Sequence, residues 1–379
     1  MSGLDELWRA ASAARAERPH VSLALATLHA VEGSSYRQPG ARLLVDADGR
    51  VLAGAVSGGC LEGDIALHAA AVCTSGIPVR LTYDLRDDLQ TIWGFGAMCD
   101  GVAHVLLEPL TDLTWLGAAH AVREARTGGA LVTVIEESAH GGTRPLDACT
   151  AATQKAIAPL VEQALATAHP EAASVEHDGA TMRYLIDPLV PPVSLILIGA
   201  GRGADAFAQI ATTLGWRVTV VDHRPFVLQS LPLPDGCVRL GARADDGAAQ
   251  IHSDARTAVA LLTHQFAIDR EWLSALLPRP VGYIGVLGSR RRAEQLLDAL
   301  RADGMVISPR MERVLHAPIG LDLGGETPES IALAAIAEIE AVMHGRPGGS
   351  LRSRQSPIHA RTPTPEPAPP ISSAPDTPL

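Results

Sequence analysis

The stretch of sequence that decides the fold is VSLILIGAGRGA, residues 193–204. Its first half is almost wholly aliphatic and predicts a buried strand, and the spacing of Gly199, Gly201 and Ala204 predicts a tight turn that leads into a helix. In such a turn Gly199 allows the change of direction, Gly201 lets a phosphate approach the backbone, and Ala204 lets the helix pack closely on the strand. The stretch is therefore typical of a nucleotide-binding fold.

Strand and helix patterns alternate through the second half of the chain. We expect strands at residues 193–198, 217–222, 257–262 and 281–287, and helices at residues 203–214, 269–277, 289–303 and 328–344. Because this alternation is typical of parallel strands joined by helices, we predict an α/β fold with a Rossmann-like, doubly wound parallel-sheet domain over residues 193–345.

The rest of the chain predicts a second domain and a tail. Residues 1–187 carry mixed strand and helix signals and predict an N-terminal mixed α+β domain, which Pro188, Pro191 and Pro192 separate from the Rossmann-like domain. Proline, serine and threonine dominate residues 346–379. This segment cannot bury enough apolar surface to offset the entropy of ordering, so we expect a disordered, proline-rich tail.

The N-terminal domain contains several clear local signals. Residues 21–31 predict a buried strand, and residues 42–45 and 51–56 flank an Asp-Gly turn and predict a hairpin. A helical pattern runs over residues 60–74 and stops at Gly76.

The composition limits the kind of protein. With 379 residues, of which 47% are hydrophobic, the chain is long enough for two domains with their own cores. The net charge of -11 and the lack of a lysine- or arginine-rich block in the two predicted domains argue against nucleic-acid binding. No apolar run reaches the length of a membrane span, and the five cysteines form no disulfide pattern. We therefore expect a cytoplasmic protein that binds neither a membrane nor nucleic acid.

Residues that follow the expected strands are candidates for holding a ligand. Asp222 stands about twenty residues after the glycine turn, where an acid reads the ribose hydroxyls of a dinucleotide, and Thr263 and His264 follow another strand. Ligands bind at this carboxyl edge of open α/β sheets. Because Arg224 is positively charged and follows Asp222 closely, a nucleotide with a 2′-phosphate is also a candidate ligand. The alternatives are a Rossmann domain without a ligand and a His264 that is an ordinary surface histidine.

The helix expected at residues 289–303 begins with an unusual cluster of charge. Ser289 is a natural N-cap, whereas arginines in the first turn of a helix oppose its dipole. A bound anion would offset this mismatch, and arginine suits bidentate contact with phosphate. Gly288, Ser289, Arg290 and Arg291 are therefore candidates for a phosphate site. The alternative is a solvated, ion-paired helix face.

Two cysteines lie in glycine-rich surroundings. Cys60 follows Gly58 and Gly59 and opens an expected helix, a position that favours the reactive thiolate form and leaves room for a bulky ligand. Cys99 lies in a loop of glycine, alanine and methionine, where we expect an accessible thiol. The alternative for Cys60 is an inert, buried side chain, and nothing in the spacing supplies the other ligands of a zinc site. The remaining cysteines, which we expect to be packing residues, are Cys73, Cys149 and Cys237.

Several long stretches occur together along the chain. They are residues 31–41 (VEGSSYRQPGA), 56–62 (VSGGCLE) and 105–109 (VLLEP), the turn at Gly199, residues 220–222 (VVD), Thr263-His264, residues 283–291 (YIGVLGSRR) and residues 316–322 (HAPIGLD). In these stretches and in their order the sequence resembles the XdhC/CoxI family, accessory proteins that mature xanthine dehydrogenase and related molybdenum hydroxylases. The resemblance covers nearly all of residues 1–345.

The resemblance implies a chaperone for the molybdenum cofactor, in its molybdopterin or its dinucleotide form. Proteins of this family protect the cofactor while sulfur replaces a terminal oxo ligand, and they deliver it to an apo molybdenum hydroxylase of the xanthine dehydrogenase type. A cysteine desulfurase is the implied source of the sulfur. We expect an accessory factor more than a turnover enzyme and, from the paired domains and alanine-rich helices, a homodimer.

Two cysteines match motifs of the family. Cys60 matches the Gly-Gly-Cys-Leu-Glu motif, and Cys99 matches the cysteine of a second glycine-rich loop, so both are implied reactive residues. Cys60 is also the implied molybdenum or sulfur ligand, a role that suits a soft thiolate. The second loop departs from the family's Gly-Cys-Gly-Gly pattern, because Met98 and Asp100 stand beside Cys99. The histidine motif departs as well, with Gln265 where many members have an acid or asparagine.

Functions of other classes stay open. The C-terminal domain alone would suit an NAD(P)-dependent oxidoreductase, in which His264 or His316 would have to donate a proton to the substrate. A nucleotide-sensing regulator without chemistry is a third interpretation.

Overall fold

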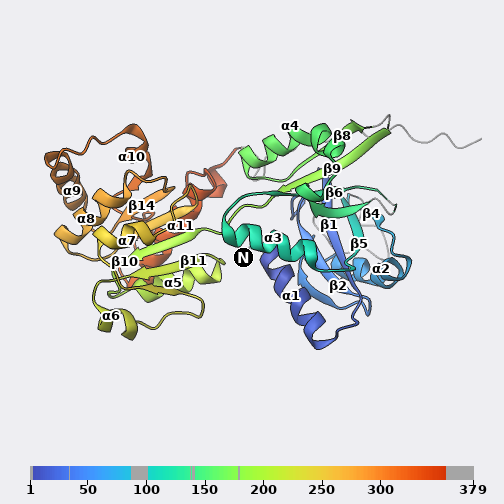
Figure 1. The fold of residues 1–379 in the computed structure, drawn as a ribbon, viewed down its shortest axis with the longest axis horizontal. Helices are drawn as coiled ribbons and strands as arrows, with labels where there is room; N and C mark the ends of the chain where they lie inside the picture. Colours follow the sequence, from blue (N-terminus) through green and yellow to red (C-terminus); the bar gives the residue numbers. More distant parts are fainter. Residues whose placement is uncertain are drawn as a thin grey trace, which may run out of the picture. The chain divides into compact units, whose positions relative to one another are not determined.

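The structure is a computed structural model, and it describes residues 3–33, 35–86, 101–136, 138, 141–177 and 180–355. Gly3–Val190 form one compact unit and Pro191–Gln355 form another, and each is described by itself (Figure 1). Cys99, with its neighbours Met98 and Asp100, lies outside the described residues, as do residues 356–379 of the expected tail. Within the described part of that tail, Leu351–Ser353 form a short 3₁₀ helix.

The described part of the N-terminal unit consists of two antiparallel sheets and four helices. Its helices are α1 (Gly3–Glu17), α2 (Glu62–Ser75), α3 (Thr114–Ala125) and α4 (Ala151–Thr167). Its strands are β1 (Leu23–Gly33), β2 (Arg42–Asp46), β3 (Val51–Gly54), β4 (Val79–Asp84), β5 (Gly101–Pro109), β6 (Ala130–Val134), β7 (Gly142–Pro145), β8 (Glu171–His177) and β9 (Ala180–Pro188). One sheet has the strand order β3-β2-β1-β5-β4, and the other has the order β7-β6-β9-β8.

Local sequence explains how the first of these sheets forms. The Asp46 carboxylate accepts the backbone N–H of Asp48 at 3.1 Å and that of Arg50 at 2.9 Å, and this turn joins β2 and β3 as an antiparallel hairpin. Helix α2 packs Ile65 against this sheet and ends at Gly76, whose left-handed φ of 70° suits glycine. The predicted hairpin and the predicted end of the helix are confirmed.

The C-terminal unit is a single parallel sheet with helices on both faces. Its strands are β10 (Ser194–Ile198), β11 (Arg217–Val221), β12 (Val238–Leu240), β13 (Thr257–Leu261), β14 (Tyr283–Val286) and β15 (Leu315–His316). Its helices are α5 (Ala204–Thr213), α6 (Pro225–Ser230), α7 (Ala244–Gln250), α8 (Phe266–Leu276), α9 (Arg290–Ala302), α10 (Pro309–Val314) and α11 (Pro328–Met343). The strand order is β12-β11-β10-β13-β14-β15. This is the order of dinucleotide-binding Rossmann folds, in which the winding reverses between the first strand and the fourth.

The core of the C-terminal unit lies on the two faces of the sheet. Phe207 of α5 and Ile336 of α11 belong to the cluster on one face, and Trp272 of α8 and Leu296 of α9 belong to the cluster on the other (Figure 1). The prediction of a doubly wound parallel sheet is confirmed. The sequence did not predict β12, β15, α6, α7 or α10, because elements of two to seven residues are too short to give a periodic signal.

Candidate functional site

The glycine turn lies at the carboxyl end of β10, where the winding of the sheet reverses. Gly199 has a φ of 108°, and a Cβ built on it would lie 3.2 Å from the Cα of Thr263, so glycine is needed for the turn to pass β13. Gly201 has no other atom within 4 Å of its Cβ position, which leaves its backbone open to a ligand. Ala204 is fully buried, as close packing of α5 on the sheet requires. The structure thus brings Gly199, Gly201 and Thr263 together at one edge.

Asp222 is held by the protein itself. Its Oδ2 accepts the backbone N–H of Ala200 in the glycine turn at 2.8 Å, and Arg224 donates to both carboxylate oxygens at 2.8 and 2.9 Å. Burial would raise the pKa of Asp222, but these hydrogen bonds outweigh it and lower the pKa to about 2. The residue expected to read a ribose therefore anchors the glycine turn, with its oxygens already occupied by donors from the chain.

Thr263 and Arg292 are joined through a buried acid that the sequence did not single out. The Thr263 hydroxyl donates to Asp269 Oδ1 at 2.5 Å, and Arg292 donates to Asp269 Oδ2 at 2.7 Å. Because Asp269 is fully buried, it needs this arginine as a counter-ion. Thr263 and Arg292 are therefore committed to holding the start of α8 against the start of α9.

His264 has an unusual backbone at the edge of the sheet. Its side chain is exposed, and its φ is 57°, in the left-handed region. The other described residues with positive φ that are not glycine, Arg126 and Ala168, are the C-caps of helices, which His264 is not. A residue held in this region away from a helix end is a feature of functional sites.

Helix α9 begins as the sequence predicted. Ser289 is its N-cap and accepts the backbone N–H of Arg292 at 3.3 Å. Arg290 and Arg291 are exposed in the first turn, and neither forms an ion pair within the described part of the chain. Gly288 has a φ of 142°, and a Cβ there would lie 2.8 Å from the Arg292 side chain. Of the three arginines, only Arg292 has its charge compensated, so Arg290 and Arg291 are the two available to an anion.

A crevice opens beside this edge, between the ends of β11 and β13 and helix α8. Asp222, Arg224, Arg243, Gln265 and Glu271 line it together with apolar residues. Arg243 is exposed and, like Arg202 in the glycine turn, has no ion-pair partner among the residues that the structure describes. Sequence reasoning missed both arginines, since single basic residues in loops give no pattern.

Cys60 lies before helix α2, not in it. The helix begins at Glu62, with Leu61 as its N-cap, so the expected helix start at Cys60 is wrong by two residues. The Ser57 hydroxyl and the Glu62 carboxylate accept the backbone N–H of Leu61, and the Leu61 carbonyl accepts the first helical hydrogen bond from Ile65 at 3.0 Å, so Leu61 is the cap and Cys60 stays outside the helix. Cys60 is half-buried and packs against the cluster formed by α2 and its sheet.

The loop that carries Cys60 is organised by Glu62 and Ser57. Glu62 Oε1 accepts the backbone N–H of Val56 at 3.1 Å and that of Ser57 at 2.8 Å, and Oε2 accepts the Ser57 hydroxyl. The Ser57 oxygen in turn accepts the N–H groups of Gly59 and Leu61, each at 3.1 Å. Burial would raise the pKa of Glu62, but the hydrogen bonds from Ser57 and its neighbours keep it below the usual value. Sequence reasoning missed this role, although Ser57 and Glu62 flank the cysteine.

The two glycines before Cys60 leave the loop accessible on one side. Gly59 has a φ of 111°, and nothing lies within 4 Å of its Cβ position. A side chain at this position would be strained and would occupy this open space next to Cys60 in the chain. The arrangement can therefore present a thiol to a bulky ligand from a loop of fixed shape.

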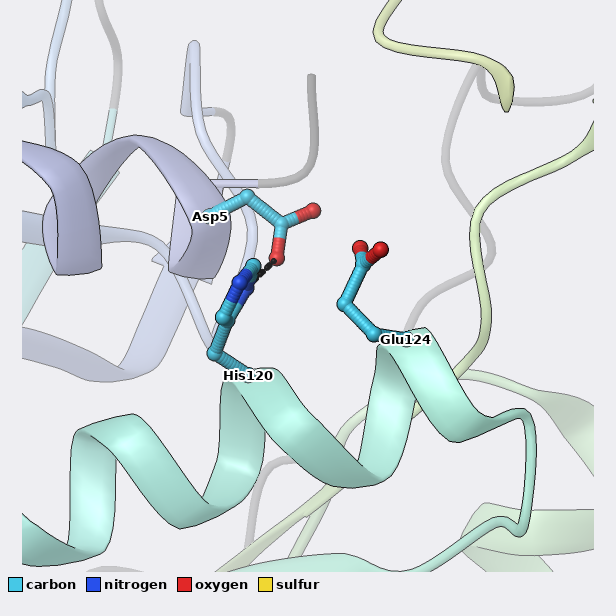
Figure 2. Close-up of side chains that lie close together, drawn as sticks. All are labelled: Asp5, His120 and Glu124. Atoms are coloured by element: carbon cyan, nitrogen blue, oxygen red, sulfur yellow. Dashed lines mark hydrogen bonds and ion pairs between the residues drawn. The ribbon is translucent and has the colours of Figure 1, made fainter. Parts of the chain in front are cut away.

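Helices α1 and α3 of the same unit bring together a second group of polar side chains. Asp5, His120 and Glu124 have ligand-type atoms within 4.8 Å of one another (Figure 2). However, Asp5 accepts from His120 at 3.0 Å and from the buried Arg123 at 3.3 Å, so its charge is already compensated. A metal ion would compete with Arg123 for the same carboxylate. We therefore interpret the group as an ion-pair network that ties α1 to α3, and within the described residues Cys60 joins no comparable group.

Comparison with known proteins agrees with this geometry. The family model described as XdhC Rossmann domain matches residues 195–339, and the model described as XdhC and CoxI family matches residues 16–84. The chain belongs to the XdhC and CoxI family. The Rossmann match contains the glycine turn and the start of α9, and the XdhC and CoxI match contains the Cys60 loop.

Individual relatives of the XdhC and CoxI family cover most of the chain. A Bacillus subtilis protein, whose name describes it as a probable component of xanthine dehydrogenase, is 29% identical over 327 residues, which are 83% of this chain and 91% of that protein. The molybdenum cofactor insertion chaperone PaoD of Escherichia coli is 24% identical over 318 residues, 84% of this chain and 82% of its own. A crystal structure described as a xanthine dehydrogenase from Bacillus halodurans matches with a TM-score of 0.69 and 25% identity, covering 93% of this chain and 99% of its own.

Among the described residues of this XdhC-family chain, no helix combines the length and the apolar character that a membrane span requires.

Proposed function

We propose that this protein is a chaperone for the molybdenum cofactor, which it carries to an apo molybdenum hydroxylase of the xanthine dehydrogenase type. The observation that supports this proposal best is the Cys60 loop, in which Glu62 and Ser57 fix the backbone while Gly59, the residue before the cysteine, has open space at its Cβ position. An enzyme that only transfers hydride would not need such a loop. The name of PaoD, a relative over most of the chain, points in the same direction.

In this proposal Cys60 holds the metal end of the cargo. The cofactor brings a molybdenum atom on a dithiolene, and a thiolate is a soft ligand that suits this metal. Cys60 either binds the molybdenum or carries the sulfur that a cysteine desulfurase supplies. Gly58 and Gly59 give the cofactor room to approach. Cys99 is the second reactive cysteine that we propose, and it awaits a direct test.

The Rossmann-like unit would hold the phosphate end of the cofactor, or the nucleotide of its dinucleotide form. Gly199 makes the turn, and Gly201 then presents open space at the start of α5, where N–H groups and the helix dipole favour an anion. The uncompensated guanidinium groups of Arg290 and Arg291 would add bidentate contacts from α9. Other residues of the same edge would complete the site: His264, Gly288 and Ser289 would lie next to the ligand, whereas Ala204, Asp222 and Thr263, which are buried or already paired, would hold the turn in place.

An NAD(P)-dependent oxidoreductase is the alternative that the Rossmann-like unit suggests. It would need a carboxylate that reads the ribose hydroxyls. Asp222 occupies that position, but its oxygens already accept hydrogen bonds from Arg224 and from the Ala200 N–H. This favours the chaperone over the dehydrogenase.

Co-purification tests the proposal. The full chain, expressed in cells that make the cofactor, should retain molybdenum and the oxidised pterin derived from it in amounts that approach one per chain. The loaded protein should then activate an apo hydroxylase of the xanthine dehydrogenase type. Purified protein without either component, together with steady oxidation of NADPH, would contradict the proposal and favour the oxidoreductase.

A further inference from the structure

An exposed aromatic ring lies beside the Cys60 loop. Tyr36 is 67% exposed. Among the described residues of the N-terminal unit, it is the only aromatic side chain in the set of strongly exposed large apolar ones; the others are Val51, Leu67, Ile77 and Leu165. Exposing a flat ring to water forgoes the stabilisation that burial would give it. A ring in this position is free to contact a ligand.

The ring of Tyr36 touches the loop that presents the cysteine. A Cβ built on Gly58 would lie 3.7 Å from the Tyr36 Cγ and 3.8 Å from its Cδ1, which is ordinary contact distance. The ring therefore lies next to Gly58, and the chain then continues through the open Gly59 to Cys60. A side chain at Gly58 would lie against the ring, so the glycine leaves this side of the ring uncovered.

A cation lies over the same ring. The guanidinium carbon of Arg37 is 5.7 Å from the centre of the Tyr36 ring, within the range of a cation–π contact. Both side chains are exposed, so a ligand can reach the ring and the guanidinium together. Arg37 offers several N–H donors in one plane, the geometry that pairs with carbonyl oxygens on the edge of a heterocycle.

The ring also lies next to the backbone of the Cys60 loop, which is already ordered before a ligand binds. The Ser57 hydroxyl and the Glu62 carboxylate satisfy the N–H groups of Val56, Ser57, Gly59 and Leu61. A site whose backbone is already fixed loses less conformational entropy on binding. The loop that carries Cys60 is therefore already fixed on the side that faces the ring of Tyr36.

We propose that Tyr36 stacks on the pterin ring of the cofactor and that Arg37 donates to the pterin carbonyl oxygen. This inference rests on the proposed function, and it assigns the pterin to the N-terminal unit, beside Cys60. Flat heterocycles stack on exposed aromatic side chains in many binding sites, and each such contact strengthens binding by roughly tenfold. Tyr36 and Arg37 would thus select for the ring of the cargo, whereas Cys60 selects for its metal end.

Pterin-6-carboxylate, a fluorescent pterin without dithiolene or metal, tests the stacking separately from the cysteine chemistry. Its affinity for the full chain is measured by fluorescence anisotropy for the unchanged protein and for Tyr36→Ala, Tyr36→Phe, Cys60→Ala and Phe226→Ala. The last is a matched control, because Phe226 is 84% exposed but belongs to the C-terminal unit. We expect about tenfold weaker binding for Tyr36→Ala and unchanged binding for the other three variants. Tyr36 is exposed, so its variants should keep the unfolding temperature of the unchanged protein.

Each other result counts against a defined part of the account. Equal affinity of Tyr36→Ala and the unchanged protein would overturn the stacking inference. Failure of the unchanged protein to bind the pterin, while it still co-purifies with molybdenum, would also overturn the inference but leave the proposed function standing. A protein that retains neither the pterin nor molybdenum would remove the proposed function as well.

Discussion

The carboxylate of Glu62 accepts both the backbone N–H and the hydroxyl of Ser57, and this pair of contacts fixes the loop that presents Cys60. A single acid, two residues beyond the cysteine, thereby sets the shape of the backbone on both sides of it. The negative charge is also placed where it strengthens these hydrogen bonds.

Glu62→Gln should lower the free energy of unfolding and loosen the loop. Hydrogen bonds to a charged group contribute roughly 1.5–3 kcal/mol each, and the substitution weakens them without removing the side chain. Because the pKa of Glu62 is lowered in the folded protein, its contribution is full above its ordinary pKa of 4.5 and is lost as the pH falls through the folded value. Urea unfolding measures how much Glu62→Gln lowers the free energy of unfolding at pH 7 and at pH 4. This loss should be smaller at pH 4.

The control for this substitution is Glu162→Gln, at an exposed position in α4. It should leave the free energy of unfolding almost unchanged at both values of pH. Equal effects of the two substitutions would show that Glu62 does not organise the loop.

Asp222→Asn should destabilise the C-terminal unit at neutral pH. The substitution removes the charge that pairs with Arg224 and that accepts the Ala200 N–H, at a cost of roughly 1–3 kcal/mol. Since the folded pKa of Asp222 is about 2 and its ordinary value is 3.8, the stabilisation is present above pH 4 and disappears as the pH falls toward 2. Thermal unfolding over this range is the measurement, with exposed Asp235→Asn as the control. A stability difference between Asp222→Asn and the unchanged protein that grows as the pH falls would contradict the prediction.

The double substitution Arg290→Ala, Arg291→Ala should weaken cofactor binding without destabilising the protein. If these arginines contact a phosphate, each contact contributes roughly 1.5–3 kcal/mol, so the dissociation constant should rise by about two orders of magnitude or more. The unfolding temperature of the protein without cofactor should stay the same or rise slightly, because two charges that oppose the dipole of α9 are removed. The test measures both the cofactor affinity and the unfolding temperature of the double variant and of the unchanged protein.

Arg301→Ala, in the last turn of the same helix, is the matched control for this pair. Arg301→Ala should leave both the cofactor affinity and the unfolding temperature nearly unchanged. An unchanged affinity in the double variant would assign the anion to the Gly199 turn alone.

Deletion of residues 347–379 should leave the unfolding temperature and cofactor binding unchanged. The segment has too few large apolar residues to bury it against either unit, and its described part, residues 347–355, is exposed apart from Arg354. Calorimetry of the truncated protein is the check. A fall of several degrees would mean that the segment docks on a folded unit.

Sequence patterns predicted the elements of the C-terminal unit better than the partners of its polar residues. The glycine turn, the N-cap at Ser289 and the parallel sheet follow from local composition and periodicity. The pairing of Arg292 with Asp269 does not, because the two residues lie on different helices and meet only in the folded unit. Of the three adjacent arginines, the sequence could not show which one is neutralised inside the protein.

Asp222 and the Cys60 loop illustrate the same limit. The position of Asp222 after a strand indicates a ribose ligand, yet in the folded unit Arg224 and Ala200 occupy its oxygens. A helical pattern predicts that Cys60 opens α2, yet the Glu62 side chain bonds back to Ser57 and the helix starts two residues later. In both cases a side chain that returns to the backbone outweighs the local pattern.

The central claim is that Cys60 holds the metal end of a molybdenum cofactor. The most direct measurement is the molybdenum content of Cys60→Ala after expression in cofactor-producing cells, compared with that of Cys149→Ala and Cys237→Ala. The latter two cysteines are also half-buried, but neither follows a pair of glycines. We predict that Cys60→Ala loses most of its molybdenum and that the two controls keep theirs, while all three variants unfold near the temperature of the unchanged protein. Equal molybdenum content in the three variants would contradict the account.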